Sequence, residues 1–263
     1  MRLFLNVLRL NEEIARSLAG RSMGVEVSAF SDPGLLEDPL RAEEEVERLR
    51  SLIKEFSLPV RFHGPFYDLY PASRDPSLQR AVLARLKQGI VLARRIGASS
   101  MVVHPHYIYP GDKEDVRKSW TERCAGLLGL LIPLMEENKV DIQLENVREP
   151  RPDYLTGLVE ELAHPGFGIC LDTGHVHLFG ADRSQEYWLD KTSPFLRAVH
   201  LNGNHGLEDE HLAFTKGDLE WGAFFSKIRE LHHSCELVIE VMREEDYSES
   251  VHALAKMGIR GEI

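Results

Sequence analysis

Acidic and imidazole side chains recur at the ends of short apolar runs in this chain. They appear in seven segments: Phe62-His63-Gly64-Pro65, Val103-His104-Pro105, Leu144-Glu145-Asn146, Leu171-Asp172-Thr173-Gly174-His175, Val199-His200-Leu201, Asp209-Glu210-His211 and Ile239-Glu240-Val241. Imidazole and carboxylate groups are ligands that divalent metal ions take from proteins. Segments so far apart in the sequence can share an ion only if the fold brings their ends together. The pattern therefore predicts an architecture as well as a metal centre.

The apolar runs alternate with amphipathic helical patterns along the chain. We expect strands at residues 3–8, 24–29, 59–63, 100–104, 140–145, 166–172, 197–202 and 237–241. Apolar residues recur at helical spacing over 39–56, 77–96 and 218–231, which predicts helices there, and a thinner stripe predicts a helix at 181–191. Gly97 and Gly258 are placed to end helices.

Eight strands that alternate with helices form either a doubly wound sheet or a closed (β/α)8 barrel. In a doubly wound sheet, only the strand ends near the switch point lie together. Ligand-type residues in this chain follow the third to the eighth expected strands, and a closed barrel brings all of these ends around one pocket. No linker divides the sequence. We therefore predict a single α/β domain over residues 1–263, a (β/α)8 TIM barrel.

The composition limits the partners and the compartment of the protein. The chain carries 31 Lys and Arg against 42 Asp and Glu, a formal charge of −11, which disfavours nucleic acid because tight binding needs clustered cations. A local basic rim can nevertheless coexist with a negative total. Cys124, Cys170 and Cys235 form no CxxC pair and are expected to be reduced thiols. The lack of a signal-like start or a long apolar stretch predicts a cytoplasmic protein without a membrane segment.

Each candidate ligand also has an ordinary structural interpretation. A single histidine at a strand end, such as His63 or His104, is more often a packing or capping residue than a ligand. Glu145 and Glu240 lie within apolar runs, where an unpaired buried carboxylate is costly. No Lys or Arg follows another expected strand to pair with both. Metal ligation or catalytic pairing is therefore the better explanation of these two glutamates.

Two short motifs strengthen the metal interpretation. Asp172 ends an expected strand, and Gly174 permits a tight turn that returns His175 toward the same ion; the alternative is a helix-capping Asp with an exposed His. Asp209 and His211 are two residues apart, so both side chains point the same way in an extended loop. The alternative there is a charged, solvated loop. With the strand-end residues, these motifs give a ligand set that unrelated structural roles explain poorly.

The number of candidate ligands bears on the number of ions. One divalent ion takes about three or four protein ligands, so nine correspond to about two or three ions if all are engaged and a carboxylate bridges them. We expect Zn or Mn as a cofactor, with about one to three ions per chain. His106, His177 and His205 are expected beside the ligands or on the surface, and His232-His233 on a solvated helix face.

These residues resemble the metal site of the xylose-isomerase-like TIM-barrel superfamily, which includes sugar isomerases and epimerases and the endonuclease IV type of apurinic-site nuclease. The resemblance extends from His63-Gly64-Pro65 to Ile239-Glu240-Val241. The sugar epimerases hold a single ion, and the matching positions are Glu145, Asp172, His200 and Glu240. The nucleases hold three zinc ions with five further ligands, and the matching positions are His63, His104, His175, Asp209 and His211.

Two departures from the nuclease pattern disfavour a DNA-directed role. The nucleases usually have Gly after the second His-Pro, where this chain has His106, and a longer basic segment before Asp-x-His. Residues 202–208 are instead neutral to acidic. Loop cations that could contact a DNA backbone are few, namely Arg148, Arg151, Lys216 and Arg243.

The sequence favours the first of three functional hypotheses. The first is a metal-dependent isomerase or epimerase of a small sugar or sugar phosphate, in which Glu145 and Glu240 take and return a proton. Lys216 or Arg243 would then bind a substrate phosphate. The second is an endonuclease IV-like hydrolase of phosphodiesters or other phosphate esters at a centre with several ions. The third is a metal-binding barrel without activity, which the presence of both central carboxylates disfavours.

Overall fold

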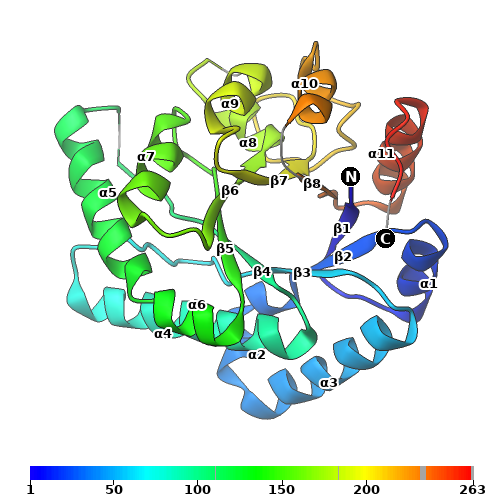
Figure 1. Ribbon diagram of the computed structural model, residues 1–263, viewed down its shortest axis with the longest axis horizontal. Coiled ribbons are helices and arrows are strands. Elements are labelled where there is room, and N and C mark those ends of the chain that lie inside the picture. Colours follow the sequence, from blue (N-terminus) through cyan, green and yellow to red (C-terminus); the bar gives the residue numbers. More distant parts are fainter. Residues whose placement is uncertain (110, 183, 232–234, 262–263) are drawn as a thin grey trace.

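Eight parallel strands pair in chain order and close into a barrel, as the sequence predicts. The computed structural model describes residues 1–109, 111–182, 184–231 and 235–261. In Figure 1 the strands form a central ring that helices surround. The strands are β1 (Leu3–Val7), β2 (Gly24–Val27), β3 (Val60–His63), β4 (Ser100–Val103), β5 (Asp141–Glu145), β6 (Phe167–Asp172), β7 (Leu196–Leu201) and β8 (Glu236–Ile239). The predicted (β/α)8 TIM barrel is thus confirmed.

Helices cover the outside of the ring. They are α1 (Glu12–Gly20), α2 (Pro33–Glu37), α3 (Pro39–Glu55), α4 (Pro76–Ile96), α5 (Glu114–Gly129), α6 (Ile132–Asn138), α7 (Asp153–Leu162), α8 (Thr173–Phe179), α9 (Gln185–Thr192), α10 (Phe224–Glu230) and α11 (Glu244–Lys256), with a 3-10 turn at Ala29–Ser31. Asp38 and Asp75 cap α3 and α4 by accepting hydrogen bonds from backbone N–H groups of the first turn. Gly97 ends α4 with φ +92°, a conformation that favours glycine. The helices expected at 39–56 and 77–96 are therefore present, and the helix expected at 181–191 is present from Gln185.

The helix expected at 218–231 is wrong over its first half. α10 begins only at Phe224, and a loop precedes it. Gly222 has φ +31° in this loop. The Trp221 indole donates a hydrogen bond to the Phe214 carbonyl at 2.8 Å, and its ring packs against Phe225. The apolar residues that suggested a helix therefore pack from a loop held by this tryptophan.

Three further expectations concern thiols, membrane helices and a histidine pair. Cys124, Cys170 and Cys235 are free and buried, in agreement with the expected lack of disulfides. Within the described ranges, no helix is both long and apolar enough to cross a membrane. The expected solvated helix face at His232-His233 lies outside the described residues.

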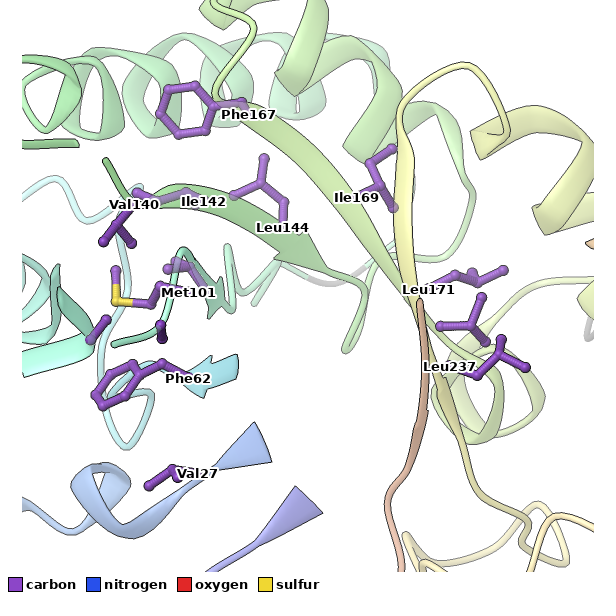
Figure 2. Close-up of a cluster of buried hydrophobic side chains, with 14 of the residues drawn as sticks. Val27, Phe62, Met101, Val140, Ile142, Leu144, Phe167, Ile169, Leu171 and Leu237 are labelled. Carbon is purple, nitrogen blue, oxygen red and sulfur yellow. The ribbon is translucent and has the colours of Figure 1, made fainter. Parts of the chain in front are cut away.

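The two faces of the strands pack differently. A large apolar core lies between the strands and the helices, and Figure 2 shows members such as Phe62 and Leu237 outside the ring of strands. Val102, Cys170 and Ala198 form a small cluster separate from that core. Because neighbouring residues on a strand point to opposite faces, these three face the inside of the barrel. Its interior is therefore apolar only in part.

A buried arginine occupies the inside of the barrel. Arg61 of β3 is 1% exposed, and its Nε lies 2.9 Å from Glu26 Oε2 of β2. The same guanidinium pairs with Glu236 of β8 and donates to the Gln143 side chain of β5 at 2.7 Å. A buried charge is tolerated only when it is paired and hydrogen-bonded. This lower charge layer, defined by Arg61, Glu26, Glu236 and Gln143, meets that condition with side chains from four strands.

The candidate ligands form a second layer, toward the carboxyl ends of the strands. Residues two apart on a strand share a face, so His63 faces inward as Arg61 does. A register shift between β6 and β7 makes Asp172 the direct strand partner of His200. The strand periodicity and this irregularity together point the ligand side chains at one another.

Replacing Arg61 with methionine is expected to lower the free energy of unfolding by about 3–5 kcal/mol, because Glu26 and Glu236 then lose their buried cation. The matched control is Arg2→Met. Arg2 pairs with the same Glu236 from a side chain that is 57% exposed, and exposed pairs contribute about 0–1 kcal/mol. Urea unfolding of both chelator-treated variants measures the difference, and equal losses would contradict this account of Arg61.

Candidate metal centre

Three overlapping groups of ligand atoms lie at the carboxyl ends of the strands. The first group is His63, Glu145 and His200, the central group is Glu145, Asp172, His200 and Glu240, and the outer group is His175, Asp209 and His211. Within each group the ligand atoms lie within 4.8 Å of one another. The remaining candidate, His104, has Nε2 3.2 Å from Glu145 Oε2. The fold therefore brings together all of the ligands named from the sequence.

Neighbouring groups orient the two histidines around Glu145. His63 Nδ1 lies 3.0 Å from the Gly64 carbonyl oxygen, which only accepts, so Nδ1 carries the proton. His63 Nε2 then faces Glu145 Oε2 at 3.4 Å. Phe66 stacks on the His104 ring with 4.7 Å between centroids. His63 Nε2 and the Glu145 carboxylate are thus both directed at the place that an ion would occupy.

The central group collects side chains from four consecutive strands, β5 to β8, or from their ends. His200 Nδ1 lies 2.9 Å from Glu240 Oε2, 3.4 Å from Glu145 Oε2 and 4.0 Å from Asp172 Oδ2. Within the described residues, the ion-pair partners of Glu145 and Glu240 are histidines and not Lys or Arg. These carboxylates therefore have no permanently charged cationic partner there.

Asp172 combines two roles that the sequence presented as alternatives. Its Oδ1 accepts a hydrogen bond from the His175 N–H at 2.6 Å and so caps α8. Its Oδ2 accepts from Asn202 Nδ2 at 2.7 Å, and Asn146 hydrogen-bonds the Asp172 backbone in both directions. His175 is only 5% exposed, so the capping interpretation with an exposed histidine is wrong. The cap and the asparagines hold the carboxylate in the central group.

Gly174 is required for a close approach and not for the tight turn that we expected. The residue lies within α8, which begins directly after β6. A Cβ atom at this position would lie 1.8 Å from Asn202 Oδ1 and 3.0 Å from Asn204 Nδ2. The helical turn itself, and not a glycine turn, returns His175 toward Asp172.

The outer group forms because the loop after β7 folds back on itself. Gly203 and Leu212 form an antiparallel bridge that closes this loop. His211 has φ +47°, so the extended conformation expected for the Asp209–His211 motif is wrong at its last residue. Both side chains nevertheless reach the same point, because the loop closure and not strand alternation directs them.

Backbone carbonyls select the ring nitrogens that the outer group presents. His175 Nδ1 lies 2.9 Å from the Asn146 carbonyl oxygen, and His211 Nδ1 lies 3.2 Å from that of Glu240. The two Nε2 atoms face Asp209 Oδ2 at 3.1 and 3.3 Å. Hydrogen bonds to the far nitrogen of this kind orient metal-binding histidines. The outer group is therefore arranged as a ligand set before any ion binds.

Protons balance the carboxylates of the centre when no cation is bound. Burial lowers the pKa of His175, but Asp172 and Asp209 outweigh this effect and raise it well above its usual value. Burial is likewise outweighed at His211, where Asp209 and Glu240 raise the pKa to about 9. Burial raises the pKa of Asp172 to about 7. An ion that binds here must displace protons.

Buried atoms that lack partners fit a bound cation. The buried atoms without an aligned hydrogen bond among the described residues include His104 Nδ1, both ring nitrogens of His200 and Glu240 Oε2. Native proteins rarely leave such atoms without a partner, and an ion is one way to complete them. Five imidazoles and four carboxylates form the whole set, which suits zinc. The centre can therefore hold divalent metal ions.

The residues expected to bind a substrate phosphate lie beside carboxylates. Lys216 Nζ is 2.7 Å from Asp246 and 3.3 Å from Glu249. Arg243 Nη1 is 3.6 Å from Glu245 and its side chain is 67% exposed. Acidic partners thus already engage both cations, and their role toward a phosphate stays a prediction.

Two of the remaining histidines lie where the sequence placed them. His106, with φ +52°, has its ring 5.2 Å from that of His104 and its Nε2 3.3 Å from the Phe66 carbonyl oxygen. His205 pairs with Glu210 on an exposed loop. His106 therefore lies beside the first group, and His205 lies on the surface.

Residues that support the ligands were missed in the sequence. Asn146 and Asn202 bind Asp172, and Glu26 Oε1 lies 3.0 Å from His200 Nε2. Glu26 carried the signal used for Glu145, a carboxylate within an apolar run, but it does not end its strand. The asparagines carried no signal beyond their proximity to a ligand in the chain.

Comparisons with known proteins agree with the barrel fold. A family profile described as xylose isomerase-like TIM barrel matches residues 19–257. The TTHB071 protein from Thermus thermophilus, whose structure was solved after soaking with ZnCl2, is 28% identical to this chain. The two structures match with a TM-score of 0.80 over 98% of both chains. A D-tagatose 3-epimerase-like protein is 21% identical with a TM-score of 0.80 over 97% of this chain and 96% of its own. The protein named probable endonuclease 4 of Carboxydothermus hydrogenoformans is 26% identical over 183 residues, 67% of this chain and 61% of that protein.

Binding of Zn²⁺ is expected to release protons and to strengthen as the pH rises. The raised pKa values of His175 and His211 keep both rings charged at neutral pH in the ion-free protein, and a charged ring cannot ligate a metal. The gain in affinity should continue at least to about pH 9, where His211 is half deprotonated. Calorimetric titrations in buffers with different ionisation enthalpies measure the released protons. An affinity that stays constant from about pH 6 to about pH 8 would contradict the expectation.

The substitution Gly174→Ala is expected to weaken zinc binding by about 10–100-fold, the usual effect of disturbing residues behind metal ligands. The new methyl group displaces Asn202, which donates to Asp172 at 2.7 Å. Gly157→Ala in α7 is the matched control, because its Cβ would meet no atom within 4 Å. That control should bind zinc as the wild type does and gain about 0.5–1 kcal/mol of stability. Equal affinities for all three proteins would refute the role of Gly174.

Proposed function

The chain belongs to the xylose isomerase-like TIM barrel family, and on this premise we propose that it hydrolyses a small phosphate ester at a centre of several divalent ions. The observation that carries the proposal is the outer group of His175, Asp209 and His211 beside the central group. Proton transfer at a single ion does not require this additional ligand set. Hydrolysis at phosphorus does employ several ions, which hold the attacking and leaving oxygens.

The donor set favours zinc, with manganese as the alternative, and up to about three ions. Imidazole suits zinc, whereas magnesium and calcium prefer oxygen ligands, and imidazoles outnumber carboxylates here. Glu145 belongs to both the first and the central group, so its carboxylate would bridge them. Ions held by these residues would polarise the phosphate and activate water as the nucleophile.

Differences in exposure indicate the side from which a substrate would enter. The Asp209 side chain is 38% exposed, whereas that of Glu145 is 1% exposed. Glu240 of the central group is 15% exposed, and its Oε2 lies 4.0 Å from His211 Nδ1 of the outer group. A phosphate would therefore meet the outer group first, and Glu240 next to it.

The charges around the centre favour a small substrate over a DNA duplex. Of the cations expected to contact a backbone, Arg151 pairs with Asp112 and Asp153, and Lys216 has carboxylate partners of its own. Arg148 lies over the Phe179 ring at 5.4 Å. A phosphate backbone needs several uncommitted cations to neutralise it. The formal charge of −11 adds to this argument.

A sugar isomerase or epimerase is the second candidate, and the central group alone supports it. Glu145 and Glu240 both contact His200 Nδ1, at 3.4 and 2.9 Å, so two carboxylates flank the place of a single ion. Such a pair can exchange a proton with a substrate carbon, as carbohydrate isomerisation requires. A small carbohydrate would be the substrate in this case.

Removal of one outer ligand distinguishes the candidates. Protein purified without chelator is expected to contain about two to three zinc ions and to hydrolyse bis(p-nitrophenyl) phosphate. His211→Ala should lose about one ion and lower kcat/KM by more than about 100-fold, since even residues behind metal ligands contribute about 10–100-fold. His205→Ala on the same loop is the control, because its ring pairs with Glu210 on the surface, and it should retain both properties.

Other outcomes would favour a different function. A single ion per chain, with interconversion of ketohexoses that survives His211→Ala, would support the isomerase candidate. Cleavage of a duplex with an abasic site would contradict the small substrate. Glu240→Gln should lose metal under both candidates, and full metal content in that variant would refute its place among the ligands.

A further inference from the structure

Glu26 lies behind His200, on the side of the ring opposite the central group. Its Oε1 is 3.0 Å from His200 Nε2, whereas Nδ1 of the same ring faces Glu240 and Glu145. Both Glu26 and His200 are 0% exposed. The imidazole is therefore placed between a carboxylate that belongs to the ligand layer and one that does not.

The carboxylate of Glu26 is held from two neighbouring strands. Asn6 Nδ2 on β1 donates to Oε1 at 2.8 Å, and Arg61 Nε on β3 donates to Oε2 at 2.9 Å. Asn6 is held in turn by the Ser28 hydroxyl, which donates to its Oδ1 at 2.6 Å. These contacts fix Glu26 without involving His200, so Glu26 can orient the imidazole ring.

His200 is oriented differently from three of the other ligand histidines. His63, His175 and His211 direct Nδ1 to backbone carbonyls and Nε2 to carboxylates, although His175 Nδ1 also lies 3.3 Å from Glu145 Oε1. At His200 the two nitrogens exchange roles, with Nδ1 toward the ligand carboxylates and Nε2 toward Glu26. A carboxylate therefore takes the place that a carbonyl has elsewhere, and a charged acceptor makes an imidazole a stronger ligand.

A cation bound at Nδ1 of His200 would leave the ring proton on Nε2. Neither nitrogen of His200 makes an aligned hydrogen bond within the described residues, although a carboxylate oxygen lies 2.9 Å from Nδ1 and another lies 3.0 Å from Nε2. The Cys170 thiol also lies against His200. A thiol is a weak hydrogen-bond acceptor. Glu26 is therefore the strong acceptor that remains for the proton on Nε2.

We propose that Glu26 is a positioning residue for the central ion: it holds the proton of His200 on Nε2 and so keeps Nδ1 free for the metal. Arg61 donates to the other oxygen of Glu26, so the lower charge layer contacts the metal centre through this one carboxylate. The proposal rests on the proposed function only in requiring an ion in the central group.

The test compares Glu26→Gln with two neighbours that should not affect the ion. Glu236→Gln removes the other carboxylate from Arg61 without touching His200, and Cys170→Ala removes the thiol. Chelator-stripped proteins are titrated with Co²⁺, whose visible absorption reports the coordination. Glu26→Gln is expected to bind about 10–100-fold more weakly, with an altered spectrum, and both controls should match the wild type. Wild-type binding by Glu26→Gln, or equal weakening by Glu236→Gln, would overturn the proposal.

Nitrogen-15 NMR of histidine in the zinc-loaded wild type gives a second test that needs no variant to fold. His200 is expected to carry its proton on Nε2 and the metal on Nδ1, whereas His63, His175 and His211 show the reverse. Zinc on His200 Nε2 would overturn the proposal. Neither test involves turnover, so a protein that binds zinc as expected but hydrolyses no ester would refute the proposed function alone.

Discussion

Opposite charges must be matched inside this barrel, because burial removes the water that would otherwise screen them. The lower charge layer is matched within the protein, since Arg61 pairs with Glu26 and Glu236, and Arg2 pairs with Glu236 as well. The ligand layer contains four carboxylates and five imidazoles. Within the described residues, Lys and Arg do not pair with its central carboxylates Glu145 and Glu240. Protons or metal cations must therefore complete that layer, and the rest of the site follows from this requirement.

The ring nitrogens show how the protein prepares for a cation. Carbonyl groups take the Nδ1 protons of His63, His175 and His211, and we propose that Glu26 takes the Nε2 proton of His200. Each ring is thereby left with one nitrogen directed at carboxylates. The cost of ordering these groups is met during folding, so little reorganisation remains for metal binding. The outer group extends the same arrangement beyond what one ion needs, which is why we favour ester hydrolysis.

The strands and the ligands could be predicted because both depend on local patterns. Apolar runs identify buried strands, and a carboxylate or imidazole at the end of such a run has few explanations other than a shared site. Loop conformation was less accessible. The expected turn at Gly174, the extended loop at His211 and the first half of the helix at 218–231 were wrong, because distant contacts of Asn202, Leu212 and Phe214 decide them.

The sequence by itself determined the barrel and the identity of the metal-ligand candidates, since strand periodicity and residue type are local properties. Only the tertiary structure decided how these candidates divide into first, central and outer groups. It also revealed Arg61 and Glu26 in contact beneath them. Their partners come from strands far apart in the chain, and closure of the barrel alone brings them within ion-pair distance. The number of ions and the orientation of each ring depend on those contacts across the barrel, which no local pattern encodes.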